Sequence, residues 1–399
     1  MPYDGLHAEH VRRSMARIER STGKQYLRSP VLEERTRDEV RAFLEKSFAE
    51  QMPDAQLAGA EAVYKRFGFF ADTFNLRAHM LDLLTEQIAG YYDPDTDVLY
   101  IVGDAAPELL RGTITHELVH ALQDQHFPLD SLQRITGDND RRTAAQAVAE
   151  GQAMWEQLVV QTGVANPSNV IPGGWDAVRQ MIREDRAGMP KLTSAPMLLR
   201  EALLFPYLSG AEHIREFKTR RPGAWPFDSL PVSTEQVLHA ERFFDDRDDP
   251  VRLTLPRLGR GAETVFEDGL GEFETRLFLF QHARDLPLAS RSAAGWDGDR
   301  FVLARLPGGA EVLVWATVWD SVLDAAEFVD ALETVLPNRY LGLERRPSDA
   351  DRRRFEGAGR TVEVRAVTLD GHSVVILVDI PAGVPTTLVD PALIRLSPQ

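Results

Sequence analysis

The chain has 399 residues, of which 43% are hydrophobic and 27% are charged, and this composition is typical of a globular protein with two or three domains. The formal net charge of −16 argues against binding to nucleic acid or to an anionic membrane surface, because both repel an acidic protein. The absence of cysteine excludes disulfide bonds and thiolate metal sites.

The sequence also carries no feature that predicts a membrane protein. It contains no run of about 18 or more apolar residues, so we expect no membrane-spanning segment. The first twenty residues are polar and charged and lack the apolar stretch of a secretory signal. A chain without cysteine suits the cytoplasm, but it also suits an exported bacterial protein whose signal has been removed. We therefore expect a soluble protein, either cytoplasmic or exported after the removal of a signal.

The N-terminal part of the chain predicts helices followed by two short strands. Apolar residues recur at helical spacing within residues 31–50 and again within 80–88. Tyr91 and Tyr92 and then residues 98–102 predict two strands, which are joined by a turn-rich segment. Pro107 suits the first turn of a helix that we expect to end near His126, before Pro128.

The rest of the chain predicts more helices and then a mixed α and β pattern. Helices are expected over residues 142–161, 197–204, 211–219 and 323–336, strands over 301–306 and 312–319, and a hairpin of 361–367 with 373–380. The acidic residues 245–250 predict a linker. The fold class is therefore α+β, with a helical N-terminal region (1–90), a mainly helical core with a short sheet (91–250) and a C-terminal α+β domain (251–399).

The sequence His116-Glu117-Leu118-Val119-His120 lies on the helix predicted after Pro107. Four residues advance a helix by slightly more than one turn, so both imidazoles lie on one face and can bind one metal ion. Glu117 points to the side, where it can take a proton from a water whose pKa Zn²⁺ lowers to about 7. A chance match on a solvated helix is the alternative, but the apolar residues of this helix place the motif on an element that packs on a core.

Two residues compete to be the third zinc ligand. His126 lies ten residues after His116, as in the metzincin pattern, but that pattern has a glycine where this chain has Gln123. Without that glycine the helix continues, and His126 would lie about 15 Å along the axis. We favour Glu150, which is followed by Gly151 on the next predicted helix. A glycine in a helix interior costs about 1 kcal/mol, and close approach to the first helix would explain it.

His116 to His120 together with Glu150-Gly151-x-Ala153 resembles the gluzincin clan of zinc peptidases, whose aminopeptidase members carry a zinc-binding Glu in a similar run. Further segments resemble an uncharacterised family of bacterial zincin-like peptidases, which often has an acidic residue where this chain has Gln152. The segments, in chain order, are Glu86–Pro94, His116–Phe127, Ala149–Ala153, Phe205–Tyr207, Ser233–His239 and Gly295–Arg300. The resemblance implies a zincin-like core over the central region.

The resemblance also implies a Tyr or His that donates to the oxyanion of the transition state. Tyr207 and His239 are the candidates, because both lie in segments that resemble the family. Each has a structural alternative, since Tyr207 next to Pro206 can be a core aromatic and His239 can hold Glu235 or Gln236 in place. Three tryptophans in the C-terminal region, Trp296, Trp315 and Trp319, have strand spacing that favours a core position over a binding surface.

The pattern as a whole predicts a zinc-dependent metallopeptidase with Zn²⁺ on His116, His120 and Glu150 and with Glu117 as general base. Residues 98–102 would form the edge strand that binds an extended peptide or protein substrate. Two alternatives remain open. One is a catalytically silent zinc-containing binding or scaffold protein, and the other is a zinc hydrolase of a non-peptide amide or ester.

Overall fold

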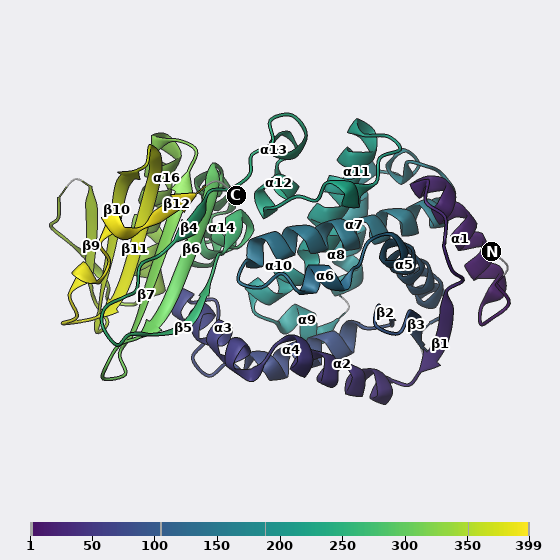
Figure 1. The fold of residues 1–399 in the computed structure, drawn as a ribbon, viewed down its shortest axis with the longest axis horizontal. Coiled ribbons are helices and arrows are strands. Elements are labelled where there is room, and N and C mark those ends of the chain that lie inside the picture. Colours follow the sequence, from purple (N-terminus) through teal and green to yellow (C-terminus); the bar gives the residue numbers. More distant parts are fainter. Residues whose placement is uncertain (1–2, 104–105, 188, 350, 398–399) are drawn as a thin grey trace. The chain divides into compact units, whose positions relative to one another are not determined.

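The computed structural model describes residues 3–103, 106–187, 189–349 and 351–397. The chain forms two compact units, whose elements are labelled in Figure 1. Unit 1 comprises Met1–Asp54, Asn75–Thr136 and Arg142–Pro231, and unit 2 comprises Ala55–Phe74, Gly137–Arg141 and Val232–Gln399. None of the helices in the described residues combines the length and the apolar character needed to cross a lipid bilayer.

This division differs from the three successive regions that the sequence suggested. Residues Ala55–Phe74 belong with the C-terminal part of the chain. The reason is aromatic packing, because the ring of Phe67 lies 5.3 to 5.8 Å from the rings of Phe278, Phe301 and Trp315. The C-terminal segment of unit 2 also begins at Val232 rather than near residue 250. Contacts between such distant segments leave no trace in local periodicity.

Unit 1 is mainly helical and contains one small sheet. Its elements are α1 (Ala8–Thr22), β1 (Val31–Arg35), α2 (Arg37–Gln51), α4 (Leu76–Gln87), β2 (Gly90–Asp93), β3 (Val98–Val102), α5 (Pro107–His126), α6 (Asp130–Gln133), most of α7 (Asn139–Thr162), η1 (Pro167–Asn169), α8 (Gly174–Ala187), α9 (Pro190–Ser194), α10 (Met197–Phe205), η2 (Pro206–Gly210), α11 (Ala211–Arg220) and η3 (Pro226–Asp228). The helices expected after Pro107 and over 142–161, 197–204 and 211–219 are therefore confirmed.

The sheet of unit 1 has the strand order β1-β3-β2, in which β1 is parallel and β2 antiparallel to β3. The two strands predicted near residues 91 and 98 are confirmed. The prediction that residues 98–102 form the edge strand is wrong, because β3 is the central strand and β2 lies at the edge. The helix expected over 31–50 begins only at Arg37, since Thr36 and Glu39 form a capping box that starts α2.

Helix α5 passes through the core of unit 1. Its buried residues Ile114, Leu118 and Leu122 belong to one apolar cluster with Leu99 and Ile101 of β3. Helix α1 contributes further apolar side chains to the same cluster. The i, i+4, i+8 spacing of the three α5 residues puts them on one face of the helix. The position of α5 is therefore fixed by burial on the sheet and on α1, and the motif residues are carried on this fixed element.

Unit 2 contains an antiparallel sheet with the order β5-β6-β7-β11-β10-β9-β8. Its elements are nearly all of α3 (Asp54–Phe67), α12 (Thr234–Leu238), α13 (Ala240–Phe244), β4 (Arg252–Thr254), β5 (Glu263–Asp268), α14 (Gly271–Ala283), α15 (Leu286–Ala293), β6 (Trp296–Arg305), β7 (Glu311–Trp319), α16 (Val322–Arg339), β8 (Glu344–Arg346), β9 (Arg352–Gly357), β10 (Arg360–Leu369), β11 (His372–Pro381), η4 (Thr386–Leu388), η5 (Pro391–Leu393) and β12 (Arg395–Ser397).

The two faces of this sheet are covered by different parts of unit 2. Helices α14 and α16 pack together on one face, where Trp315 meets Phe278 and Phe328 (Figure 1). The other face carries an aliphatic cluster that includes Val302, Val314 and residues of β4 and β12. The three tryptophans of the C-terminal region are 1 to 2% exposed, so their predicted core position is confirmed. The predicted hairpin and the α+β fold class are confirmed as well.

Candidate metal centre

The structure brings together the three residues that the sequence predicted as zinc ligands. Oε2 of Glu150 lies 3.1 Å from Nε2 of His116 and 3.5 Å from Nε2 of His120. One potential ligand atom from each of the three residues lies within 4.8 Å of the others. Tetrahedral zinc, with bonds of 2.0–2.2 Å to nitrogen and oxygen, holds its ligand atoms about 3.3 Å apart. The donor set and its spacing therefore fit one zinc ion.

Helix α5 supplies the two imidazoles from successive turns. Their ring centroids lie 4.9 Å apart, with an angle of 77° between the ring planes. Glu150 comes from α7, and His126 lies at the end of α5, where its Nε2 is 2.9 Å from the backbone oxygen of Gln25. The cluster of potential ligands in the described residues contains Glu150 and does not contain His126. The choice of Glu150 over His126 thus agrees with the geometry.

The side chain of Gln123 determines which nitrogen of His120 is available to a metal. Nε2 of Gln123 donates to the backbone oxygen of Ala149 and to Oε1 of Gln152, each at 3.0 Å. Since the backbone oxygen can only accept, the amide oxygen of Gln123 must face His120, and Nδ1 of His120 donates to it at 2.8 Å. The neutral ring of His120 then presents the lone pair of Nε2 toward Glu150. Such an outer hydrogen bond orients a metal-binding imidazole.

Gly151 permits a close contact between α7 and the segment that carries Tyr207. A Cβ atom at Gly151 would lie 2.2 Å from the carbonyl carbon of Gly210, and one at Gly210 would lie 2.1 Å from the backbone oxygen of Ala147. Gly151 was expected to face the first motif helix, and this expectation is wrong, because its neighbour is Gly210 at the end of η2. Two facing glycines let the two backbones approach where any Cβ would collide.

Tyr207 lies beside the metal ligands. It belongs to η2, a π-helical turn between α10 and α11, and its ring centroid is 6.0 Å from that of His116. Its half-buried side chain also packs on an apolar cluster of α8 and α10. The two interpretations of Tyr207 are therefore both compatible with its position. Single π-helical turns are frequent at functional sites, because they turn a side chain out of the regular helical register.

His239, the other predicted oxyanion donor, belongs to unit 2. It stands between α12 and α13, and its Nε2 lies 2.8 Å from Oε1 of the buried Glu272. The expected structural alternative named Glu235 or Gln236 as its partner, and the carboxylate that it contacts is instead that of Glu272. Its catalytic role stays a prediction.

Glu117 is buried next to the ligands and only 8% exposed. Burial raises the pKa of its carboxyl group, whereas His120, His116 and a hydrogen bond from the backbone of Tyr92 act in the opposite direction. A carboxylate with a raised pKa is a stronger base, which suits proton abstraction near neutral pH. Tyr92 lies on the edge strand β2, so the carboxylate of Glu117 meets that edge of the sheet.

Electrostatics also favour a cation among the three ligands. Burial lowers the pKa of His120, but Glu150 outweighs this effect and raises the pKa to about 9. Burial opposes the ionisation of Glu150, yet His120 and His116 hold its pKa well below the usual range. Glu150 is therefore ionised at neutral pH, which is the form that binds a metal. A metal ion at this point would replace the proton of His120.

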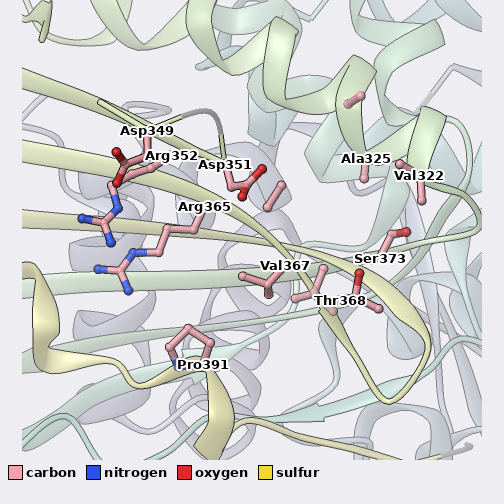
Figure 2. Close-up of a pocket in the computed structure, with 13 residues that line it drawn as sticks. Val322, Ala325, Asp349, Asp351, Arg352, Arg365, Val367, Thr368, Ser373 and Pro391 are labelled. Carbon is pink, nitrogen blue, oxygen red and sulfur yellow. The ribbon is translucent and has the colours of Figure 1, made fainter. Parts of the chain in front are cut away.

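A cavity of about 720 Å³ lies in unit 2, between α16 and the strands β9 to β11, and none of the predicted site residues lines it. Figure 2 shows Arg352 and Arg365 in its wall, side by side and with their guanidinium groups pointing the same way. Both groups face the buried carboxylate of Glu363, which accounts for their orientation. These charges are thus paired within the sheet.

Residues 257–386, which lie within unit 2, match the family model of a domain of unknown function, DUF8575. Neither the curated proteins nor the solved structures contain a match to the chain. The matched segment is about a third of the chain and includes none of the residues of the metal centre.

Proposed function

We propose that this chain is a zinc-dependent metallopeptidase. The observation that carries the proposal is the convergence of His116, His120 and Glu150 from two helices, with the carboxylate of Glu117 buried beside them. Two His and one Glu leave the fourth position of a tetrahedral ion open, as in catalytic zinc sites.

Each residue has a role that follows from its position. His116 and His120 would bind the ion through Nε2, and Glu150 would bind it through Oε2. Zinc held there supplies a Lewis acid that lowers the pKa of a coordinated water to about 7. Glu117 accepts the proton of the attacking water and passes it to the leaving amine. Tyr207 and His239 are the candidates for the oxyanion donor, and the contact between Tyr207 and His116 favours Tyr207.

The position of Glu117 next to an edge strand supports a peptide as the substrate. Strand β2 pairs with β3 on one side only, and the backbone of Tyr92 on β2 contacts Glu117. An extended peptide that adds to the edge of a sheet is held by main-chain hydrogen bonds, largely independent of its side chains. A peptide that lies along β2 would bring its scissile bond to the general base. Strand β2 therefore takes the place that the sequence assigned to residues 98–102.

Two other functions make different predictions. A zinc-containing scaffold protein would bind the ion without turnover, and a hydrolase of a non-peptide amide or ester would use the same four residues on another substrate. The buried Glu117 argues against the scaffold, because a structural site closes the fourth position with a protein ligand and has no use for a free carboxylate.

The test combines metal analysis of the purified chain with cleavage of a broad peptide library. We expect one zinc per chain and a cleavage rate that E117Q lowers by about a hundredfold or more while its zinc content remains. E108Q is a matched control, because Glu108 is an exposed residue of the same helix. Peptide cleavage by E117Q at the wild-type rate would refute the assignment of the general base. Cleavage of esters alone, or bound zinc without any turnover, would refute the peptidase and favour one of the two alternatives.

A further inference from the structure

A second group of acidic side chains lies in unit 2. Glu235 comes from α12, Asp248 from the acidic segment after α13, and Asp320 from the turn between β7 and α16. One carboxylate oxygen from each lies within 4.8 Å of the others. The three residues are far apart in the sequence, and the fold of unit 2 brings them together.

Glu235 is the unusual member of this group. It is only 1% exposed, and neither of its carboxylate oxygens has a hydrogen-bond partner among the described residues. The nearest positive group is Nε of Arg242, at 4.0 Å from Oε1. A buried carboxylate without a hydrogen bond is rare in proteins, because it loses its hydration without compensation. The carboxylate of Glu235 therefore lacks a hydrogen-bond donor or a directly bound cation among the described residues.

One guanidinium group does not balance the acidic side chains. The two terminal nitrogens of Arg242 contact Asp248 and Asp320, so its positive charge mainly compensates these two carboxylates. Burial and then Glu272, Asp248 and Asp320 raise the pKa of Glu235 to about 10. Burial and then Asp248 and Asp320 raise the pKa of the neighbouring Asp297 to about 7. The carboxyl groups of this cluster therefore outnumber the single charge of Arg242.

We propose that Glu235, Asp248 and Asp320 bind a divalent cation, calcium before magnesium, at a site that shares no residue with the zinc ligands. An all-oxygen donor set selects hard cations such as Ca²⁺ and Mg²⁺ over zinc. Ca²⁺, with bonds of about 2.4 Å and a flexible shell, accepts carboxylate oxygens anywhere within about 4.8 Å of one another, whereas Mg²⁺ demands a near-ideal octahedron and gives up its waters reluctantly. Water would complete the coordination shell, and the ion would displace the partly exposed guanidinium group of Arg242, which now contacts Asp248 and Asp320.

The ion would fasten the acidic segment to the sheet of unit 2. The sequence predicted residues 245–250 as a solvated linker, but this segment lies within unit 2. Gln236 of α12 already contacts this segment, because its Nε2 donates to the backbone oxygen of Asp248 and to Oδ1 of Asp249. A cation on Glu235, Asp248 and Asp320 adds a link from both α12 and the end of β7 to this segment. The expected consequence is a calcium-dependent stability of unit 2.

Terbium luminescence on the zinc-loaded full chain tests the site directly. Trp319 immediately precedes Asp320 and Trp296 immediately precedes Asp297, so excitation of tryptophan should sensitise Tb³⁺ bound there. We expect saturable emission that Ca²⁺ displaces. Loss of a charged ligand, in E235Q or D320N, should weaken Tb³⁺ binding by about tenfold or more. The control D246N changes an exposed residue of the same acidic segment and should bind as the wild type does.

Three results would overturn the proposal. They are the absence of saturable emission, emission that E235Q and D320N leave unchanged, and emission that disappears in the double variant H116A and H120A, which would place Tb³⁺ at the zinc ligands. If E235Q does not fold, the Tm of the wild type and of the other variants, measured with and without calcium, still tests whether the site binds calcium. Calcium should raise the Tm of the wild type and of D246N but not that of D320N, and a wild-type Tm that does not respond to millimolar calcium also refutes the site.

Discussion

Replacement of Gly151 by alanine should weaken both the fold of unit 1 and its affinity for zinc. The new Cβ would lie 2.2 Å from the carbonyl carbon and 2.4 Å from the oxygen of Gly210, and both atoms belong to the backbone and cannot rotate away. Alanine gains about 1 kcal/mol in helix propensity, but overpacking against a rigid neighbour costs about 1–3 kcal/mol or more. Because the clash is with backbone atoms, we take the upper end of this cost and expect a net loss of stability of about 2 kcal/mol.

The effect on zinc follows from the position of the neighbouring residue. Ordinary carbon contacts need about 3.5 Å, so α7 and η2 must separate by roughly 1 Å to admit the new methyl group. Glu150 immediately precedes Gly151 and moves with it, which displaces its carboxylate from its present position beside the two histidines. Supporting changes of this kind cost a metal site about 10- to 100-fold in affinity. Competition with a chromophoric chelator measures the zinc affinity, and urea unfolding measures the stability.

A matched control exists on the other motif helix. Gly112 is also a buried glycine inside a helix, but a Cβ there would lie 3.0 Å from Nε2 of Gln157, the end of a flexible side chain that can shift. We therefore expect G112A to stay within about 1 kcal/mol of the wild type and to keep its zinc affinity. If G151A matches G112A in both measurements, the close contact between Gly151 and Gly210 does not hold Glu150 in place.

Four further predictions follow from the same structure. E117Q should keep its zinc and lose kcat by about a hundredfold or more. Peptide cleavage and zinc content measured on the same sample test this, and a wild-type rate would contradict it. Q123L should bind zinc about 10- to 100-fold more weakly by chelator competition, and an unchanged affinity would remove Gln123 from the support of His120. Y207F should lower kcat by about a hundredfold with zinc intact if Tyr207 is the oxyanion donor, whereas the same loss in H239A with Y207F unimpaired would assign that role to His239. Burial, and to a lesser degree nearby arginines, lower the pKa of His282 from 6.5 to about 4, so the folded unit 2 favours the neutral ring. The stability that this preference contributes is fully present above pH 6.5 and decreases as the pH falls toward 4. H282Q should lack this decrease in urea unfolding across that range, and identical pH profiles for both proteins would refute it.

The local features of the candidate site were predictable, and its surroundings were not. The spacing of His116 and His120 and the start of α5 at Pro107 are properties of neighbouring residues, and periodicity reports them directly. Glu150 was identified through Gly151, but the helix that this glycine approaches was not, because its neighbour lies some sixty residues further along the chain. The strand order β1-β3-β2 could not be predicted either, since a parallel pairing of strands that are distant in the sequence has no local signal.

The acidic group of unit 2 shows the same limit more strongly. The sequence gives Asp248 only as part of a charged run, and such a run usually predicts a solvated loop. Glu235 and Asp320 stand in other segments, so neither belongs to the acidic run of residues 245–249. What makes the group informative is the burial of Glu235, and burial is a property of the folded unit alone.

Gln123 links the choice of Glu150 as the proposed third ligand to the course of α5. A glycine at this position, as in the metzincin pattern, ends the helix and lets a third histidine turn back toward the metal. With glutamine the helix continues to His126, and the histidine is carried away from the first two. The same glutamine bridges α5 to α7 through Ala149 and Gln152, on either side of Glu150, while its amide oxygen orients His120. Glutamine at this one position is therefore compatible with the course of α5 to His126 and also links α5 to the helix that carries Glu150.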